Sequence, residues 1–82
     1  MILEENWAVS AQRVRDFFSG QENVVSTADG FSLNDCSITV TPLPRQAGVF
    51  AVDRSLIRFD GPEPQVRAIH QRFFLRFLSA GG

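Results

Sequence analysis

Cysteine and histidine, the residue types in this chain best suited to nucleophilic or metal chemistry, each occur once. A thiol beside an imidazole can act as a nucleophile when the two groups lie within about 3.2 Å and a third group orients the imidazole. Cys36 lies in a stretch with strand-like alternation and His70 in a stretch with helical spacing, so a helix that crosses a sheet could bring them together. The sequence suggests neither an orienting group nor a cleft for this pair. We therefore predict no catalytic residue and expect Cys36 and His70 to be packing residues.

Metal and cofactor sites are not predicted either. One cysteine and one histidine cannot complete a tetrahedral zinc shell, and the acidic residues are scattered singly apart from Glu4 and Glu5. The segment 60–64 places prolines where a phosphate-binding loop needs free backbone N–H groups. We expect no metal, no cofactor and no small-molecule substrate, and hence a protein that is not an enzyme.

Length and composition indicate one small domain that spans residues 1–82. An apolar content of 44% is typical of a globular chain, and a net charge of -1 creates no field that attracts nucleic acid or anionic lipid. A single cysteine cannot form an internal disulfide. The start of the chain lacks the features of a signal peptide, and no stretch approaches the roughly 18 apolar residues of a membrane span. The expected location is the cytoplasm.

Helical spacing of apolar residues predicts a first helix over about residues 4–19, with Gly20 as a left-handed stop. The pattern in 21–34 is weaker, and we expect either two short edge strands there, joined by a turn at 28–30, or an irregular arm. The apolar stripe of the predicted helix consists of Leu3, Trp7, Ala11, Val14 and Phe18.

Strict alternation predicts a strand over 36–41, which Pro42 and Pro44 should end because proline cannot donate to a β-ladder. Two further strands are predicted at 49–52 and 56–59. An antiparallel meander with 49–52 as the middle strand places the apolar residues of all three strands on one face, and a slip of one residue would expose that face. The predicted common face consists of Ile38, Val40, Phe50, Val52, Ile57 and Phe59.

A closing helix is predicted to begin after the segment 60–64 and to run to about Ser79, with Gly81 or Gly82 as its end. Its apolar arc would cover the sheet, and the first helix would lie beside it. The expected architecture is therefore α+β, a two-layer sandwich in α-β-β-β-α order, with an antiparallel meander of three to four strands and both helices on one face. The arc consists of Val66, Ile69, His70, Phe73 and Phe77.

The expected order of elements resembles that of the double-stranded-RNA-binding domain over nearly the whole chain. That family places a lysine-rich cluster at the start of its second helix, where it grips phosphates across a groove. This chain has Pro62, Glu63, Pro64 and Gln65 at the matching place, without a lysine. The resemblance therefore implies a topology, and no functional residue of the family carries over to this sequence.

The closing helix has more apolar side chains than one sheet face needs. Phe74, Leu75 and Leu78 extend its apolar arc on the side that also holds Arg67 and Gln71. We predict that these five residues form an interface, and that the protein is a non-enzymatic protein–protein interaction or adaptor module, either a homodimer or bound to another protein.

The alternative is that these apolar side chains are covered within the chain, by packing of the first helix against Phe74 and by the segment 24–27. A different function, weak nucleic-acid binding, would use Arg67, Arg72 and Arg76 of the same helix, although nucleic acid is not the partner we expect.

Overall fold

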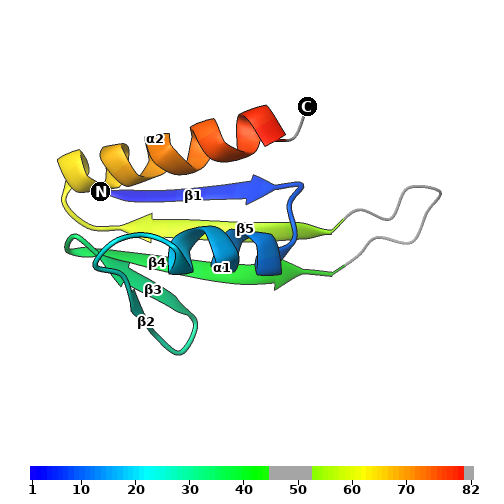
Figure 1. Ribbon diagram of the computed structural model, residues 1–82, viewed down its shortest axis with the longest axis horizontal. Coiled ribbons are helices and arrows are strands. Elements are labelled where there is room, and N and C mark those ends of the chain that lie inside the picture. Colours follow the sequence, from blue (N-terminus) through cyan, green and yellow to red (C-terminus); the bar gives the residue numbers. More distant parts are fainter. Residues whose placement is uncertain (45–52, 81–82) are drawn as a thin grey trace.

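Seven elements make up the part of the chain that the computed structural model describes, residues 1–44 and 53–80 (Figure 1). The strands form one five-stranded antiparallel sheet in the order β1-β5-β4-β3-β2, so the predicted α+β class is confirmed. The elements are β1 (Ile2–Trp7), α1 (Ala11–Ser19), β2 (Val25–Ser26), β3 (Gly30–Leu33), β4 (Cys36–Leu43), β5 (Arg54–Asp60) and α2 (Glu63–Ala80).

The N-terminal part of the predicted first helix is wrong, because residues 2–7 form strand β1 at the edge of the sheet. β1 pairs with β5 along its whole length, with Glu5 opposite Ile57. Leu3 and Trp7 pack against the core, and their spacing of four residues fits one face of a strand as well as one face of a helix. Periodicity alone could not separate the two structures, and pairing with β5 favours the strand.

The element order that follows is β-α-β-β-β-β-α, so the predicted α-β-β-β-α order with three to four strands is wrong. The topological resemblance to the double-stranded-RNA-binding domain rested on that order. With β1 ahead of α1 and five strands in one sheet, the resemblance does not hold.

Helix α1 is shorter than predicted because its sequence contains a cap at Ser10. The backbone of Ser10 is extended, and its side-chain hydroxyl accepts a hydrogen bond from the backbone N–H of Arg13, as an N-cap residue does. The helix ends before Gly20, whose backbone is right-handed (φ -85°), so the predicted left-handed stop is wrong.

Strand β4 pairs directly with β5, which corrects the predicted meander. Ile38 lies opposite Phe59 and Val40 opposite Ile57, while the other edge of β5 is occupied by β1. A strand at 49–52 therefore does not separate them, and the predicted pairing of that segment with β5 is wrong. The segment itself, with Phe50 and Val52, lies outside the described residues. The remaining four members of the predicted common face are buried as expected: Ile38, Val40, Ile57 and Phe59.

Strand β4 continues through Pro42 to Leu43, beyond the predicted end. Pairing between β3 and β4 stops where Gly30 meets Thr39, so Pro42 has a strand neighbour only on the β5 side. Proline is tolerated at such an edge because its missing N–H need not serve a second ladder.

The segment that precedes β4 forms two short strands, as predicted. β2 pairs with β3, and a two-residue turn at Asn34 and Asp35 joins β3 to β4. Both turn residues have positive φ angles, 48° and 65°, which is the backbone of the tight hairpin turns that match strand twist. Gly30 is required at the start of β3, because a Cβ there would lie 1.8 Å from the carbonyl oxygen of Ile38.

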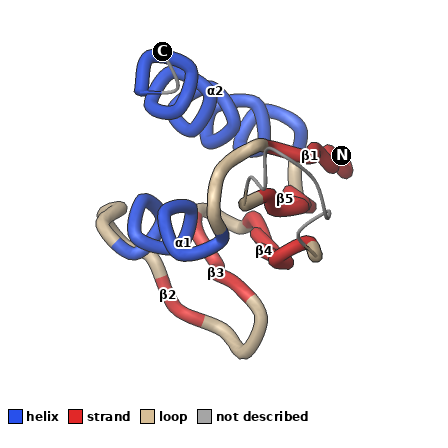
Figure 2. Tube along the Cα trace, turned by 90° about the vertical axis from the view of Figure 1, so that its right-hand side faces the viewer, coloured by secondary structure: helices blue, strands red, loops and turns tan. Residues whose placement is uncertain are grey.

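Both helices lie on the same side of the sheet and share one apolar core (Figure 2). Phe73 of α2 is fully buried, and its ring stacks on Phe18 of α1 with centroids 5.7 Å apart. The same ring meets Trp7 of β1 at 5.0 Å and Phe59 of β5 at 6.0 Å. One aromatic cluster therefore connects both helices to the sheet. The predicted inward residues of the closing helix are buried as expected: Val66, Ile69, Phe73 and Phe77.

Replacing adjacent phenylalanines tests this orientation of α2. Phe73→Ala should lower the free energy of unfolding by about 3–5 kcal/mol, because it leaves a cavity at the centre of the core. Phe74→Ala, one residue further along, should lower it by about 1 kcal/mol or less, because that ring is 38% exposed. Urea denaturation followed by circular dichroism measures both values. A Phe73→Ala protein that is unfolded in water fits the prediction, whereas equal losses for the two variants contradict it.

Candidate functional site

The predicted interface residues lie together on the surface of α2. Each of positions 67, 71, 74, 75 and 78 lies three or four residues from at least one other, so they share one side of the helix. All five side chains are exposed, and Phe74, Leu75 and Leu78 are 38%, 56% and 57% exposed. We call this set the outer patch, and it consists of Arg67, Gln71, Phe74, Leu75 and Leu78.

Phe74 anchors the outer patch to the rest of the fold. Its ring meets the Trp7 ring edge-on at 5.8 Å and the His70 ring at 6.0 Å. The residue that covers part of Phe74 therefore belongs to β1, although the sequence placed it in the first helix. The apolar patch begins at a fixed aromatic contact and extends from there along the helix.

The hydrogen-bond partner of the His70 imidazole is a carboxylate, that of Glu5, and not the Cys36 thiol. Its Nε2 lies 2.7 Å from Oε1 of Glu5, and the same oxygen accepts a hydrogen bond from Nε1 of Trp7 at 3.0 Å. His70 also packs edge-on against Phe59. The sequence did not indicate Glu5 as a partner, because a helical reading of β1 put it on the polar side. The contact ties α2 to the edge strand.

Cys36 is buried and poorly suited to nucleophilic chemistry. Burial raises the pKa of the Cys36 thiol above its ordinary value of 9.0, the nearby charge of Asp35 raises it further, and the N-terminal ammonium opposes these effects. The sulfur packs so closely against Gly61 that a Cβ at that glycine would lie 2.9 Å from it. Because the thiolate is the reactive form, a raised pKa lowers reactivity at neutral pH.

The three arginines predicted to contact nucleic acid lie in different surroundings. Arg67 forms an ion pair with Glu63 one turn away, at 2.8 Å. Arg72 borders a hollow near the β3–β4 turn, beside Asp35. Arg76 faces α1. Arg72 and Arg76 lie one turn apart on α2 and Arg67 lies on another side of the helix, so the structure does not bring all three together, and nucleic-acid binding through them stays a prediction.

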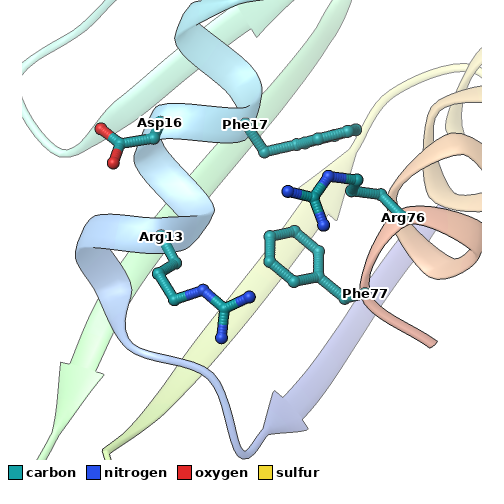
Figure 3. Close-up of a pocket in the computed structure, with 5 residues that line it drawn as sticks. All are labelled: Arg13, Asp16, Phe17, Arg76 and Phe77. Carbon is teal, nitrogen blue, oxygen red and sulfur yellow. The ribbon is translucent and has the colours of Figure 1, made fainter. Parts of the chain in front are cut away.

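A cleft of about 340 Å³ lies between α1 and α2, and Figure 3 shows the side chains that line it. The Cζ atoms of Arg13 and Arg76 lie 5.7 Å and 5.5 Å from the centroid of the Phe77 ring, within the range of cation–π contacts. Phe17 completes the apolar lining. Sequence patterns did not indicate Arg13, because nothing local shows that its helix lies beside the end of α2.

Two kinds of site are not found in the described ranges. No three histidine, cysteine, aspartate or glutamate side chains gather there in a way that could hold a metal ion. In residues 1–44 and 53–80, no helix is long and apolar enough to cross a lipid bilayer.

Comparison with known proteins gives no functional assignment for this chain. Nothing matches the chain among protein-family models, curated proteins or solved structures. The outer patch and the cleft between the helices are therefore the two features from which a function can be inferred.

The raised pKa of Cys36 predicts how stability depends on alkaline pH. The chain has no lysine and no tyrosine, so this thiol is the side chain that titrates between about pH 8.5 and 11. From its ordinary pKa of 9.0 upward the unfolded thiol ionises while the folded thiol keeps its proton. Unfolding then releases a proton, so the free energy of unfolding should fall as the pH rises above about 9.

Urea denaturation between about pH 7.5 and 10.5 measures this loss in the unmodified protein and in Cys36→Ala. The Cys36→Ala protein should show a flatter dependence above pH 9, because it retains the same N-terminal amine and lacks the thiol. Identical slopes for the two proteins would contradict a buried thiol with a raised pKa.

Proposed function

We propose that this protein is a non-enzymatic interaction module that binds another protein through the outer patch of α2, and that a second copy of the chain is such a partner. The observation that carries the proposal is the exposure of Phe74, Leu75 and Leu78 on one side of a single helix. Three large apolar side chains in the last two turns of a helix form a patch of the kind that marks interaction surfaces.

The outer patch is not needed to cover the sheet. A neighbouring side of α2 already fills the core with Phe73 and Phe77, both buried. Burial of a leucine or phenylalanine side chain that is now in water stabilises a complex by about 1.5–3 kcal/mol when burial is complete, before the costs of association are subtracted. The patch can therefore contribute to binding without a rearrangement of the core.

The composition of the outer patch supports a protein partner. Aromatic residues and arginine are enriched where interfaces are tightest, and a polar rim usually surrounds an apolar centre. Phe74 supplies a ring already fixed against Trp7, so little side-chain entropy is lost when a partner covers it. Arg67 and Gln71 extend the patch with polar groups toward the middle of the helix.

A second copy offers the same apolar surface as a partner. In a two-fold dimer the same patch serves on both chains, and two antiparallel helices would place Leu75 and Leu78 of one chain against those of the other. A net charge of -1 gives little repulsion between the two copies.

Sedimentation equilibrium between about 1 and 100 µM tests the proposal, and a dimer with a dissociation constant near 10 µM or below is expected. Leu75→Glu and Leu78→Glu should each shift the protein toward the monomer, because a charge would be buried in the interface. Both residues are exposed in the monomer, so the fold should remain.

Val25→Glu is the matched control. Val25 is 62% exposed and lies on β2, at the opposite edge of the sheet from β1. This variant should dimerise like the unmodified protein. A strict monomer at 100 µM, or equal loss of association in the control and in Leu78→Glu, would contradict a dimer through the outer patch.

A further inference from the structure

We infer that the cleft between α1 and α2 binds a small molecule in which an oxyanion, a carboxylate or a phosphate, is attached to a flat apolar body. The cleft joins two positive charges to an aromatic floor, and Figure 3 shows both guanidinium groups beside the Phe77 ring. This inference does not rest on the dimer proposed above.

The charge of the cleft comes from two helices that converge on one ring. Arg13 projects from α1 and Arg76 from α2, and both contact Phe77. Each guanidinium carries a positive charge and five N–H donors in a planar fork. Two like charges held beside one ring repel each other, and an anion bound between them would attract both and offset that repulsion.

The fold does not neutralise these two charges itself. In residues 1–44 and 53–80, no oxygen atom accepts a hydrogen bond from the guanidinium group of Arg13 or Arg76, and neither group forms an ion pair. Asp16 lies at the cleft, but its carboxylate is bonded to Nε2 of Gln12 at 2.8 Å and points away from both guanidinium groups (Figure 3).

Three other arginines of the described residues use their side-chain N–H groups in hydrogen bonds. The side chain of Arg15 donates to the carbonyl oxygen of Val40, Arg54 donates to Asn6, and Arg67 pairs with Glu63. Arg58 and Arg72 also lack a side-chain hydrogen bond among the described residues, so what distinguishes Arg13 and Arg76 is that both unbonded guanidinium groups lie at the same aromatic ring.

The aromatic floor of the cleft would contact the apolar part of the ligand. The rings of Phe17 and Phe77 meet at 5.7 Å with an interplanar angle of 67°, and Phe17 is half-buried. A volume of about 340 Å³ lies at the lower end of the range of small-molecule sites. The site therefore fits a compact ligand with one flat apolar group, held at its charged end by arginines.

The cleft is separate from the outer patch. Arg76 is two residues from both Phe74 and Leu78, and residues two apart on a helix point to nearly opposite sides. A ligand in the cleft would thus contact the α1 side of α2, and a second protein could occupy the other side at the same time.

Titration of the isotope-labelled protein with phenyl phosphate, followed by NMR, tests the inference. Saturable shifts should appear at the side-chain N–H signals of Arg13 and Arg76 and at residues around Phe17. Benzoate in a parallel titration distinguishes a carboxylate ligand from a phosphate ligand. Inorganic phosphate should bind at least about fivefold more weakly than phenyl phosphate, because it makes no contact with the aromatic floor. Benzyl alcohol should not saturate the site, because it has no charge.

Variants then assign the binding to the two arginines. Arg13→Ala and Arg76→Ala should each weaken the tighter probe by about tenfold, since each removes a charge-assisted hydrogen bond. Arg76→Lys, which keeps the charge and loses the planar fork, should weaken it less. Arg72→Ala is the matched control on the same helix and should leave affinity within about twofold. Circular dichroism confirms that each variant is folded.

The inference is overturned by any of three results. One is the absence of saturable binding of both phenyl phosphate and benzoate up to about 20 mM, below which even a weak site would fill. Another is an equal loss of affinity in Arg72→Ala and Arg76→Ala. The third is equal affinity for inorganic phosphate and phenyl phosphate, which would remove the aromatic floor from recognition.

Discussion

The burial of the Phe73 ring is the constraint on which the rest of this structure depends. Its ring contacts aromatic residues of β1, α1 and β5, so a single side chain of α2 fixes that helix against an edge strand, a second helix and an interior strand. A domain of 82 residues buries only a modest share of its surface, and few such contacts are available to replace it. The rotation of α2 about its axis follows from this one position.

That rotation determines what each side of α2 presents. With Phe73 and Phe77 inward, the side toward β1 carries His70 against Glu5 and then Phe74 against Trp7, and beyond them the outer patch faces away from the sheet. The side toward α1 carries Arg76, which lies at the Phe77 ring as Arg13 of α1 does. An apolar surface suited to a protein and a cationic cleft suited to a small anion are therefore two consequences of the same packing.

The sequence predicted α2 and the strand alternation well because each has one clear period. Helical spacing from Val66 to Phe77 is incompatible with a strand, and the alternation from Cys36 to Val40 is incompatible with a helix. The first segment was ambiguous, because the spacing of Leu3 and Trp7 suits both structures. The order of the strands in the sheet and the position of Arg13 at the cleft depend on contacts between segments that are distant in the sequence. Local patterns do not encode such contacts, and the direct pairing of β4 with β5 was missed for that reason.

The solvent exposure of α2 side chains, measured by paramagnetic relaxation from a soluble relaxation agent at low and high protein concentration, tests the orientation and the use of this helix together. We expect the methyl groups of Leu75 and Leu78 to relax strongly in the dilute protein and to become protected in the concentrated protein, with the rings of Phe73 and Phe77 protected in both. Strong relaxation of Phe73, or leucine methyl groups equally exposed at every concentration, would contradict the central claim that one buried ring directs an apolar surface outward for a second chain.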